Sequence, residues 1–404
     1  MSKHTFPTDR ELPRAKYFNE RTHTCLSNKG AFTVKLLIQP GDGVLPLIKA
    51  INAARRSIQI AIFRFDQREI ERALGNAVSR GVTVCALIAH TNRAGEESLR
   101  ELELRLLAAG VTVARTADDL IRYHGKWLIV DGKELFVLAF NFTHPDIEHS
   151  RSFGVITKNR DAVRDASRLF ECDAARQPYE PGAGGLIVSP VTARQALARF
   201  IESAKKELIV YDPKVSDPAM LRLLAERAKA GVQVRVIGRV AGGRPEIAAR
   251  KLVNQRLHTR SMVRDRCWVF VGSQSLRVME LDERREVGLI FRDSKIAHRI
   301  CDTFEADWKA SERVAEQSAR VDAEVPTDLI AKKVAKAITR ELPQVAPLVD
   351  GVVQELVGEI GQMNVAPEAM QQTVVGAVKE AVKGAVRDAL EKAVEKSRGF
   401  HDGA

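Results

Sequence analysis

Hydrophobic positions along the chain change their period at regular intervals. Residues 47–57 place apolar side chains at helical spacing, and the unbroken apolar run 58–63 that follows is typical of a buried strand. A second helical stretch covers residues 68–80 and stops at Gly81, and residues 82–88 form another apolar run. Glycine directly after a helical stretch is a common stop signal, because it adopts a positive φ without strain. The pattern predicts a helix–strand–helix–strand unit.

The same order of patterns returns 150 residues later. Helical spacing covers residues 196–206, a strand pattern covers 208–211, a second helix covers 220–230, and 231–237 form the closing apolar run. Strands that alternate with helices at this spacing predict a sheet with helices packed on its faces. The sequence therefore predicts an α/β sandwich that occurs twice.

Composition divides the chain into four segments. Residues 1–36 are polar and aperiodic, which predicts an N-terminal extension. The two lobes are expected at residues 37–178 and 179–310, joined by the Pro/Gly-rich stretch 177–185. Residues 311–404 are rich in Ala, Val, Lys and Glu and repeat Val or Leu at helical spacing over 373–396. This last segment predicts an all-α amphipathic tail that packs on the body or on a second copy of the chain.

The net charge of +11 belongs to the body of the chain. Residues 320–404 carry 11 Lys+Arg against 13 Asp+Glu, which leaves 52 against 39 for residues 1–319. A basic body suits nucleic acid or an anionic membrane surface, although a generally basic surface would give the same count. Five scattered cysteines without a CxxC pair argue for a reducing cytoplasm and against zinc or disulfides. No apolar run approaches the ~20 residues needed to span a bilayer.

The candidate chemistry lies in two segments, 134 residues apart, that carry the same spaced polar groups. In both, a cation follows a histidine by two residues, an aspartate follows it by seven, and an amide or hydroxyl follows it by seventeen. The first set is His124, Lys126, Asp131 and Asn141, and the second is His258, Arg260, Asp265, Gly272, Ser273 and Ser275. A lone His-x-Lys is a weak signal. Two copies at matched spacing indicate one active centre with a histidine from each half.

A tight hairpin explains the spacing of seventeen. Residues two apart on a strand share a face, and the Asp-Gly pair at 131–132 is a strong turn signal. If Val130 pairs with Leu135, His124 lies directly opposite Asn141, with Cβ atoms ~5 Å apart. One hairpin would then gather the imidazole, the ammonium group and the carboxamide.

The second hairpin allows a similar arrangement. Pairing Asp265 with Trp268 places His258 opposite Ser275. Asp131 and Asp265 then lie at the turns, where we expect them to hold structure rather than contact substrate. A slip of one residue would turn these side chains to the other face of the sheet.

Such a patch suits a phosphodiester. Histidine both transfers protons and attacks covalently, so one histidine can form a phosphohistidine while the other protonates the leaving alcohol and then activates water or an acceptor alcohol. We predict that the phosphoryl oxygens are held by Lys126, Asn141, Arg260, Ser273 and Ser275. No acidic cluster marks a divalent-metal site, and we expect a mechanism without metal or cofactor.

These motifs resemble the HKD signature of the phospholipase D superfamily, over roughly residues 38–308. Within it, the two-motif bacterial proteins described as cardiolipin synthase or phospholipase D-like are the most similar. The resemblance implies two α/β/α lobes related by a pseudo-twofold axis. It also implies phosphodiesterase or phosphatidyltransferase chemistry through a phosphohistidine.

Both copies depart from the signature. The first has Leu-Ala at 138–139 in place of Gly-Ser, and the second has Arg260 for lysine and Ser275 for asparagine. Family members often carry a glutamate 28 residues after the histidine, which orients its ring. Glu286 fits this position for the second histidine, whereas the first copy has Ser152 there.

The resemblance implies that His124 is the nucleophile and His258 the general acid. A pairing of Glu286 with His258 would instead mark His258 as the more basic group, so the order stays open. The residues assigned to catalysis are His124, Lys126, Asn141, His258, Arg260, Ser275 and Glu286, with Asp131, Asp265 and Gly272 as structural members of the motifs.

Three functions fit these observations. The first is a phosphodiesterase or phosphatidyltransferase that acts on phospholipid head groups and resembles cardiolipin synthase. A nuclease of the same superfamily is the alternative, and a non-catalytic phosphate-binding scaffold is the third. We expect a cytoplasmic protein or one peripheral to the inner face of the membrane, with phospholipid as its first partner and nucleic acid as the alternative.

Overall fold

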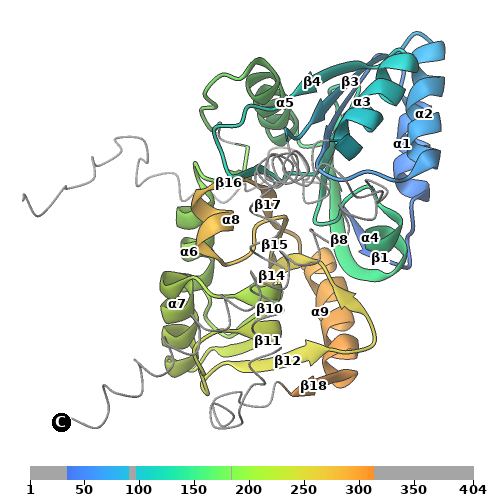
Figure 1. Cartoon of the computed structure of the whole chain (residues 1–404). Coiled ribbons are helices and arrows are strands. Elements are labelled where there is room, and N and C mark those ends of the chain that lie inside the picture. The colour runs from blue at the N-terminus through green and yellow to red at the C-terminus, as the bar shows by residue number, and fades with distance from the viewer. Residues whose placement is uncertain (1–33, 91–96, 183, 314–404) are drawn as a thin grey trace, which may run out of the picture. The chain divides into compact units, whose positions relative to one another are not determined.

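The computed structural model describes residues 34–90, 97–182 and 184–313 (Figure 1). The chain separates into a unit of residues 1–315 and a unit of residues 316–404. The described part is an α/β fold with two lobes, as predicted. The expected N-terminal extension and helical tail lie outside the described residues, except that β1 begins before residue 37 and the last strand follows residue 310.

The first lobe is built on an eight-stranded sheet. The strand order is β1-β8-β7-β6-β2-β3-β4, and β13 of the second lobe pairs with β8. Its elements are β1 (Val34–Gln39), α1 (Leu45–Ala53), β2 (Ser57–Ile62), α2 (Arg68–Ser79), β3 (Thr83–Ile88), α3 (Glu97–Ala108), β4 (Thr112–Arg115), β5 (Arg122–Tyr123), β6 (Trp127–Val130), β7 (Glu134–Leu138), α4 (His144–Glu148), β8 (Ser150–Thr157) and α5 (Arg160–Ala175).

The second lobe repeats this order. Its sheet runs β9-β17-β15-β14-β10-β11-β12-β18, so β9 takes the place of β1 and β12 that of β4, with β18 added at the edge. Its elements are β9 (Leu186–Val188), α6 (Ala193–Glu202), β10 (Glu207–Val215), α7 (Pro218–Lys229), β11 (Gln233–Val240), β12 (Ala248–Leu252), β13 (Arg256–Leu257), β14 (Arg260–Arg264), β15 (Trp268–Gly272), α8 (Val278–Asp282), β16 (Arg284–Arg285), β17 (Val287–Arg292), α9 (Ser294–Lys309) and β18 (Ser311–Arg313).

The first helix of each lobe ends earlier than its apolar pattern predicts. The helix expected over 47–57 ends at Ala53, and the one expected over 196–206 ends at Glu202. In both lobes the cause is the motif aspartate. Asp131 accepts the backbone N–H groups of residues 55–57, and Asp265 accepts those of residues 205–207. The carboxylate takes N–H groups that would otherwise continue the helix, and it directs the chain into the next strand.

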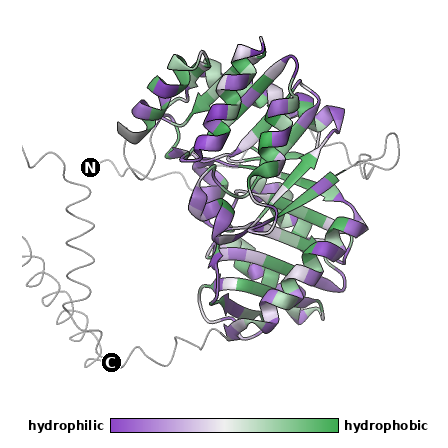
Figure 2. Ribbon diagram, turned by 90° about the vertical axis from the view of Figure 1, so that its right-hand side faces the viewer, coloured by the Kyte–Doolittle hydropathy of each residue, from purple (hydrophilic) through white to green (hydrophobic). Residues whose placement is uncertain are grey.

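Alternating side chains of the strands enter different cores. In β2, Ile58, Ile60 and Ile62 pack with α1, α2 and α3, while Ala61 faces the other lobe. Figure 2 shows the same division as mixed purple and green turns on the helices and green runs along the strands. Each lobe thus buries one face of its sheet under its own helices.

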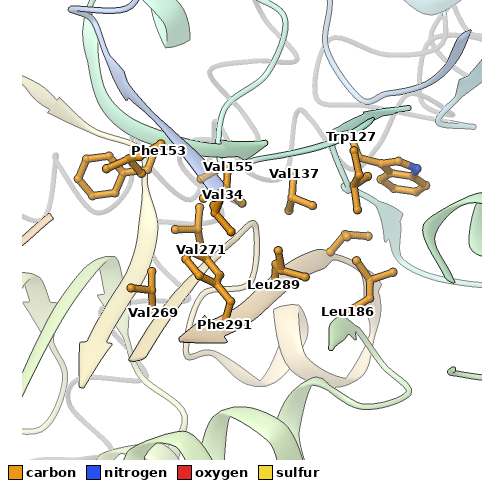
Figure 3. Close-up of a cluster of buried hydrophobic side chains, with 14 of the residues drawn as sticks. Val34, Trp127, Val137, Phe153, Val155, Leu186, Val269, Val271, Leu289 and Phe291 are labelled. Atoms are coloured by element: carbon orange, nitrogen blue, oxygen red, sulfur yellow. The ribbon is translucent and has the colours of Figure 1, made fainter. Parts of the chain in front are cut away.

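The opposite sheet faces share a core that runs through both lobes. Val137, Phe153 and Val155 of the first lobe belong to the same buried cluster as Val271 and Leu289 of the second (Figure 3). Helices α5 and α9 complete this cluster. A continuous apolar core fixes the two motif-bearing halves against each other, because separating them would expose it to water.

Two short strands cross the seam between the lobes. Strand β5 pairs in parallel with β16, with Arg122 opposite Arg284, and β13 pairs in parallel with β8, with Arg256 opposite Ser150. Subtracting or adding the motif spacing of 134 residues converts one pairing into the other. The lobes are therefore related by a pseudo-twofold axis at the seam.

Both predicted hairpin registers were wrong by one residue. Val130 pairs with Glu134 rather than Leu135, and Arg264, not Asp265, pairs with Trp268. The turn aspartates adopt positive φ values of 55° and 51°, so each connection contains three residues. Within the described residues, no helix is long and apolar enough to cross a lipid bilayer.

Candidate active site

Each histidine lies where its strand leaves its own sheet and meets the other lobe. Residues 124–126 separate β5 from β6, and residues 258–259 separate β13 from β14. The backbone N–H of His124 donates to Arg285 O at 2.7 Å, and that of His258 donates to Arg151 O at 3.1 Å. The break replaces the single strand that the sequence predicted. It also brings groups from the opposite lobe beside each ring.

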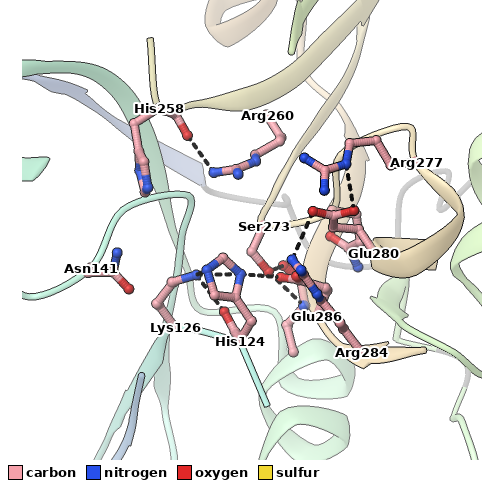
Figure 4. Close-up of polar contacts among 12 residues, drawn as sticks. His124, Lys126, Asn141, His258, Arg260, Ser273, Arg277, Glu280, Arg284 and Glu286 are labelled. Atoms are coloured by element: carbon pink, nitrogen blue, oxygen red, sulfur yellow. Dashed lines mark hydrogen bonds and ion pairs between the residues drawn. The ribbon is translucent and has the colours of Figure 1, made fainter. Parts of the chain in front are cut away.

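His124 has a complete set of partners (Figure 4). Its Nδ1 lies 2.8 Å from Glu286 Oε2, and Lys126 Nζ lies 2.9 Å from its Nε2 and 2.5 Å from its backbone oxygen. Phe63 packs edge-on against the ring at a centroid distance of 4.4 Å. Because a carboxylate accepts, the Glu286 contact assigns the ring proton to Nδ1 and leaves a lone pair on Nε2.

Glu286 serves the histidine of the other lobe, which corrects its predicted pairing with His258. Strand β16 crosses the seam and carries the residue that follows it to His124. Ser273 forms a hydrogen bond with Glu286, and Ser273 Oγ also accepts from the backbone N–H of Val287. The second motif thus retains its serine beside the carboxylate that orients the first histidine.

Gly272 is a structural member of the same motif. It pairs with Gly288 across β15 and β17, and a methyl group at position 272 would lie 2.6 Å from the Cα of Gly288. The two strands need this close approach next to Ser273. The first lobe has Leu138 paired with Gly154 at the matching place, so only one of its two positions is a glycine.

His258 has a different environment. Arg260 donates to its backbone oxygen at 2.7 Å, which matches the contact between Lys126 and His124. Its Nε2 lies 3.5 Å from Asp146 Oδ2 of the first lobe. Among the described residues, His258 Nδ1 has no hydrogen-bond partner, and neither has the hydroxyl of Ser152. The second histidine therefore has a carboxylate neighbour, but not at the position that Glu286 occupies for the first.

Asn141 and Asp146 form a buried pair. Asp146 Oδ2 accepts the side-chain amide of Asn141 at 2.6 Å and its backbone N–H at 3.0 Å. Asn141 keeps its second amide hydrogen for a ligand, so its predicted role at phosphate stays a prediction. Asp146 sits on α4, and its side chain is 1 % exposed.

Ser275 and Ser273 are already engaged, which corrects their assignment as donors to phosphate. Ser275 Oγ donates to the carboxylate of Asp212 on β10, and the same carboxylate accepts the backbone N–H groups of Lys214 and Leu276. A hydroxyl has one proton to give. Both serines thus position other parts of the site, whereas Lys126 and Arg260 remain the cationic donors.

Burial controls the charge of this centre. Desolvation lowers the pKa of His124 and of His258 well below the usual range, and the neighbouring cations, Lys126 and Arg260 among them, add to this effect. Desolvation lowers the pKa of Lys126 to about 7 against the attraction of Glu286. For Glu286, burial raises the pKa, opposed by Lys126. An anionic ligand would stabilise the charged forms of the cations.

Unpartnered polar atoms face this centre from several elements. Among the described residues, Arg260 Nε, Asn141 Oδ1, His258 Nδ1 and Glu286 Oε1 are buried without a hydrogen-bond partner. A buried polar atom without a partner costs about 1–3 kcal/mol, so a ligand with oxygens and hydroxyls would offset part of this cost. The arrangement can bind a phosphoryl group and transfer it through Nε2 of His124.

Sequence reasoning missed three residues of the site. Phe63 comes from the end of β2, Asp146 from α4 and Asp212 from β10. Only Phe63 gave a signal, as the last residue of an apolar run that ends at the sheet edge. The acids lie in polar surroundings of the sequence, where nothing distinguishes them from surface carboxylates.

A comparison with protein families agrees with this geometry. Residues 47–174 and 197–308 match the family described as "Cardiolipin synthase, PLD-like domain". The match covers both lobes and more than half of the chain. This chain belongs to the phospholipase D superfamily.

Individual relatives are distant. The chain is 27 % identical over 124 residues to mitochondrial cardiolipin hydrolase of Danio rerio, which covers 31 % of the chain and 53 % of the relative. It is 26 % identical over 275 residues to polyphosphate kinase of Vibrio cholerae, which covers 61 % and 39 %. The crystal structure of phosphatidylserine synthase from Haemophilus influenzae has the same fold, with a TM-score of 0.55, 10 % identity and coverage of 70 % and 87 %. The chain spans about half or less of the length of these two relatives by sequence.

Proposed function

We propose that this protein is a phospholipase D-type phosphodiesterase or phosphatidyltransferase acting on phospholipid head groups through a phosphohistidine. The observation that carries the proposal is the hydrogen bond of His124 Nδ1 to Glu286, 2.8 Å long and buried. It leaves the lone pair of Nε2 for attack, in a centre with two cations and a second histidine.

The first half-reaction begins with attack of His124 Nε2 on phosphorus. Lys126 donates to Nε2 at 2.9 Å in the unliganded site, and a bound phosphodiester would take over this donor. The new P–N bond forms as the P–O bond to the leaving alcohol breaks. His258 gives its proton to the departing oxygen, so the alcohol leaves neutral.

The second half-reaction runs in reverse through the same groups. His258 accepts a proton from water or from an acceptor alcohol, whose oxygen attacks phosphorus as the P–N bond breaks. Water gives hydrolysis and an alcohol gives phosphatidyl transfer, the step that a cardiolipin synthase-like reaction requires. Throughout, Lys126 and Arg260 offset the charge on the phosphoryl oxygens.

Substrate class rests on the comparisons rather than on the site. The matched family is described as cardiolipin synthase, and a matched relative as cardiolipin hydrolase. These descriptions favour a phospholipid, and a basic body favours association with an anionic membrane surface. The same basic body also supports a nuclease as the second candidate.

A substrate panel tests the proposal. Purified full-length protein is incubated with vesicles of phosphatidylglycerol, cardiolipin or phosphatidylcholine, with and without glycerol as acceptor, and separately with labelled single-stranded DNA and RNA. Polyphosphate with ADP is included because of the polyphosphate kinase match. We expect turnover of the lipid arm and its loss in His124→Ala and His258→Ala.

Each other outcome has a meaning. Cleavage of nucleic acid alone would replace the lipid proposal by the nuclease. Turnover of polyphosphate alone would point to phosphoryl rather than phosphodiester transfer. Binding of anionic vesicles without turnover in any arm, unchanged in both histidine variants, would leave the scaffold.

A further inference from the structure

Asp146 contacts three functional groups although it belongs to neither motif. Its carboxylate accepts from Arg256 Nη1 at 2.6 Å through Oδ1 and from the amide of Asn141 through Oδ2. The same Oδ2 lies 3.5 Å from Nε2 of His258. Arg256 and Asn141 thus fix both oxygens, and Asp146 reaches the second-lobe histidine from helix α4 of the first lobe.

The pseudo-twofold axis makes this contact informative. The residue equivalent to Asp146 is Glu280 on α8, which binds Arg284 at 2.8 Å and Arg277 at 3.0 Å. The residue equivalent to Glu286 is Ser152, which has no charge to offer His258. Each lobe therefore supplies one carboxylate to the histidine of the other lobe, but from different sequence positions.

We propose that Asp146 is the positioning residue of His258, holding a proton on its ring and so making it the acid of the histidine pair. The proposal rests on the proposed function, since an acid matters only if a leaving group is protonated. It also settles the division of labour. Glu286 holds the proton of His124 on Nδ1, away from the attacking nitrogen, while Asp146 keeps His258 charged.

The charges that face His258 make such a carboxylate necessary. Burial and the cations Arg260, Lys126 and Arg256 all disfavour a proton on this ring, and Asp146 alone among the named neighbours favours it. Burial would raise the pKa of Asp146, but His258, Asn141 and Arg256 hold it below the usual range. Asp146 therefore remains a carboxylate at neutral pH.

The test uses the full chain and the variant Asp146→Asn, which keeps the shape of the side chain and removes its charge. The matched control is Glu148→Gln, on the same helix, whose carboxylate binds the exposed His144. The first measurement is a titration of the His258 ring by NMR on ¹⁵N-histidine-labelled protein, with His258→Gln for assignment. This measurement needs no turnover, so it separates the present inference from the proposed function.

The second measurement compares leaving groups. A general acid contributes little when the leaving group is p-nitrophenolate and much when it is a simple alcohol such as choline. We expect Asp146→Asn to lose on the order of tenfold or more in kcat/KM for phosphatidylcholine and about threefold or less for a p-nitrophenyl phosphodiester. Asp146→Glu should recover part of the difference, and it also serves if the asparagine variant folds poorly.

The expected titration result is a fall in the apparent pKa of His258 in Asp146→Asn and no change in Glu148→Gln. An unchanged His258 titration would overturn the proposal, as would equal losses on both substrates. If the wild-type protein turns over neither substrate but the titration shifts as expected, the proposed function fails while the contact between Asp146 and His258 stands.

Discussion

The contact between Glu286 and His124 makes the most specific prediction of this structure. Glu286→Gln keeps the length of the side chain and one acceptor oxygen but removes the negative charge 2.8 Å from Nδ1. We expect slower formation of the phosphohistidine, because the imidazole carries a positive charge once it has attacked phosphorus. The charged form of the carboxylate stabilises that state.

The size of the effect follows from burial. Glu286 is 0 % exposed, so solvent does not screen the interaction. A hydrogen bond to a charged group contributes about 1.5–3 kcal/mol, and each ~1.4 kcal/mol of barrier changes the rate tenfold. Since glutamine retains an acceptor, the lower part of the range applies. We therefore expect kcat to fall by about tenfold to a hundredfold.

The assay is kcat and KM on the best vesicle substrate of the panel, for wild type, Glu286→Gln and the control Glu283→Gln. Glu283 lies three residues earlier at the partly exposed end of α8. Thermal melts of all three proteins exclude unfolding as the cause. A kcat within twofold of wild type in Glu286→Gln, or an equal loss in Glu283→Gln, would refute the assigned role.

Three further predictions concern the framework and the cation. Asp131→Ala and Asp265→Ala should each lower the free energy of unfolding by about 1–2 kcal/mol in urea titrations and leave kcat/KM unchanged, because each carboxylate holds three backbone N–H groups that are partly open to water. Gly272→Ala should cost about 1–3 kcal/mol in thermal unfolding, since its methyl group would meet the backbone of Gly288 at 2.6 Å; an unchanged melting temperature would contradict this. Burial lowers the pKa of Lys126 to about 7, so its ammonium is charged below that pH and neutral above it. We expect kcat/KM to fall as pH rises through about 7, and Lys126→Arg, which stays charged, should remove this fall.

The repeated helix and strand patterns predicted both lobes because they depend on local periodicity. The spacing of the two motifs likewise predicted which residues share a centre, since the chain duplicates that spacing. Helix ends were misplaced where Asp131 and Asp265 capture backbone N–H groups from residues far away in the chain. No local pattern encodes that contact.

The partner of Glu286 could not be read from the sequence. The spacing of 28 residues identified the right glutamate, but strand β16 pairs across the seam with β5, so its side chain belongs to the other lobe. The hairpin register failed for a related reason, since His124 and His258 leave their sheets before the positions at which they were expected to pair. Ser275 was assigned to phosphate because Asp212, its actual partner, lies 63 residues away.

Trapping the covalent intermediate tests the central claim most directly. Full-length protein is mixed with a phosphatidylcholine or phosphatidylglycerol substrate, quenched in alkali within the first turnover, digested and analysed by mass spectrometry for a phosphoryl adduct on histidine. The account predicts the adduct on His124, reduced in Glu286→Gln and accumulating in His258→Ala with a p-nitrophenyl phosphodiester. An adduct on His258, or turnover without any histidine adduct, would contradict it.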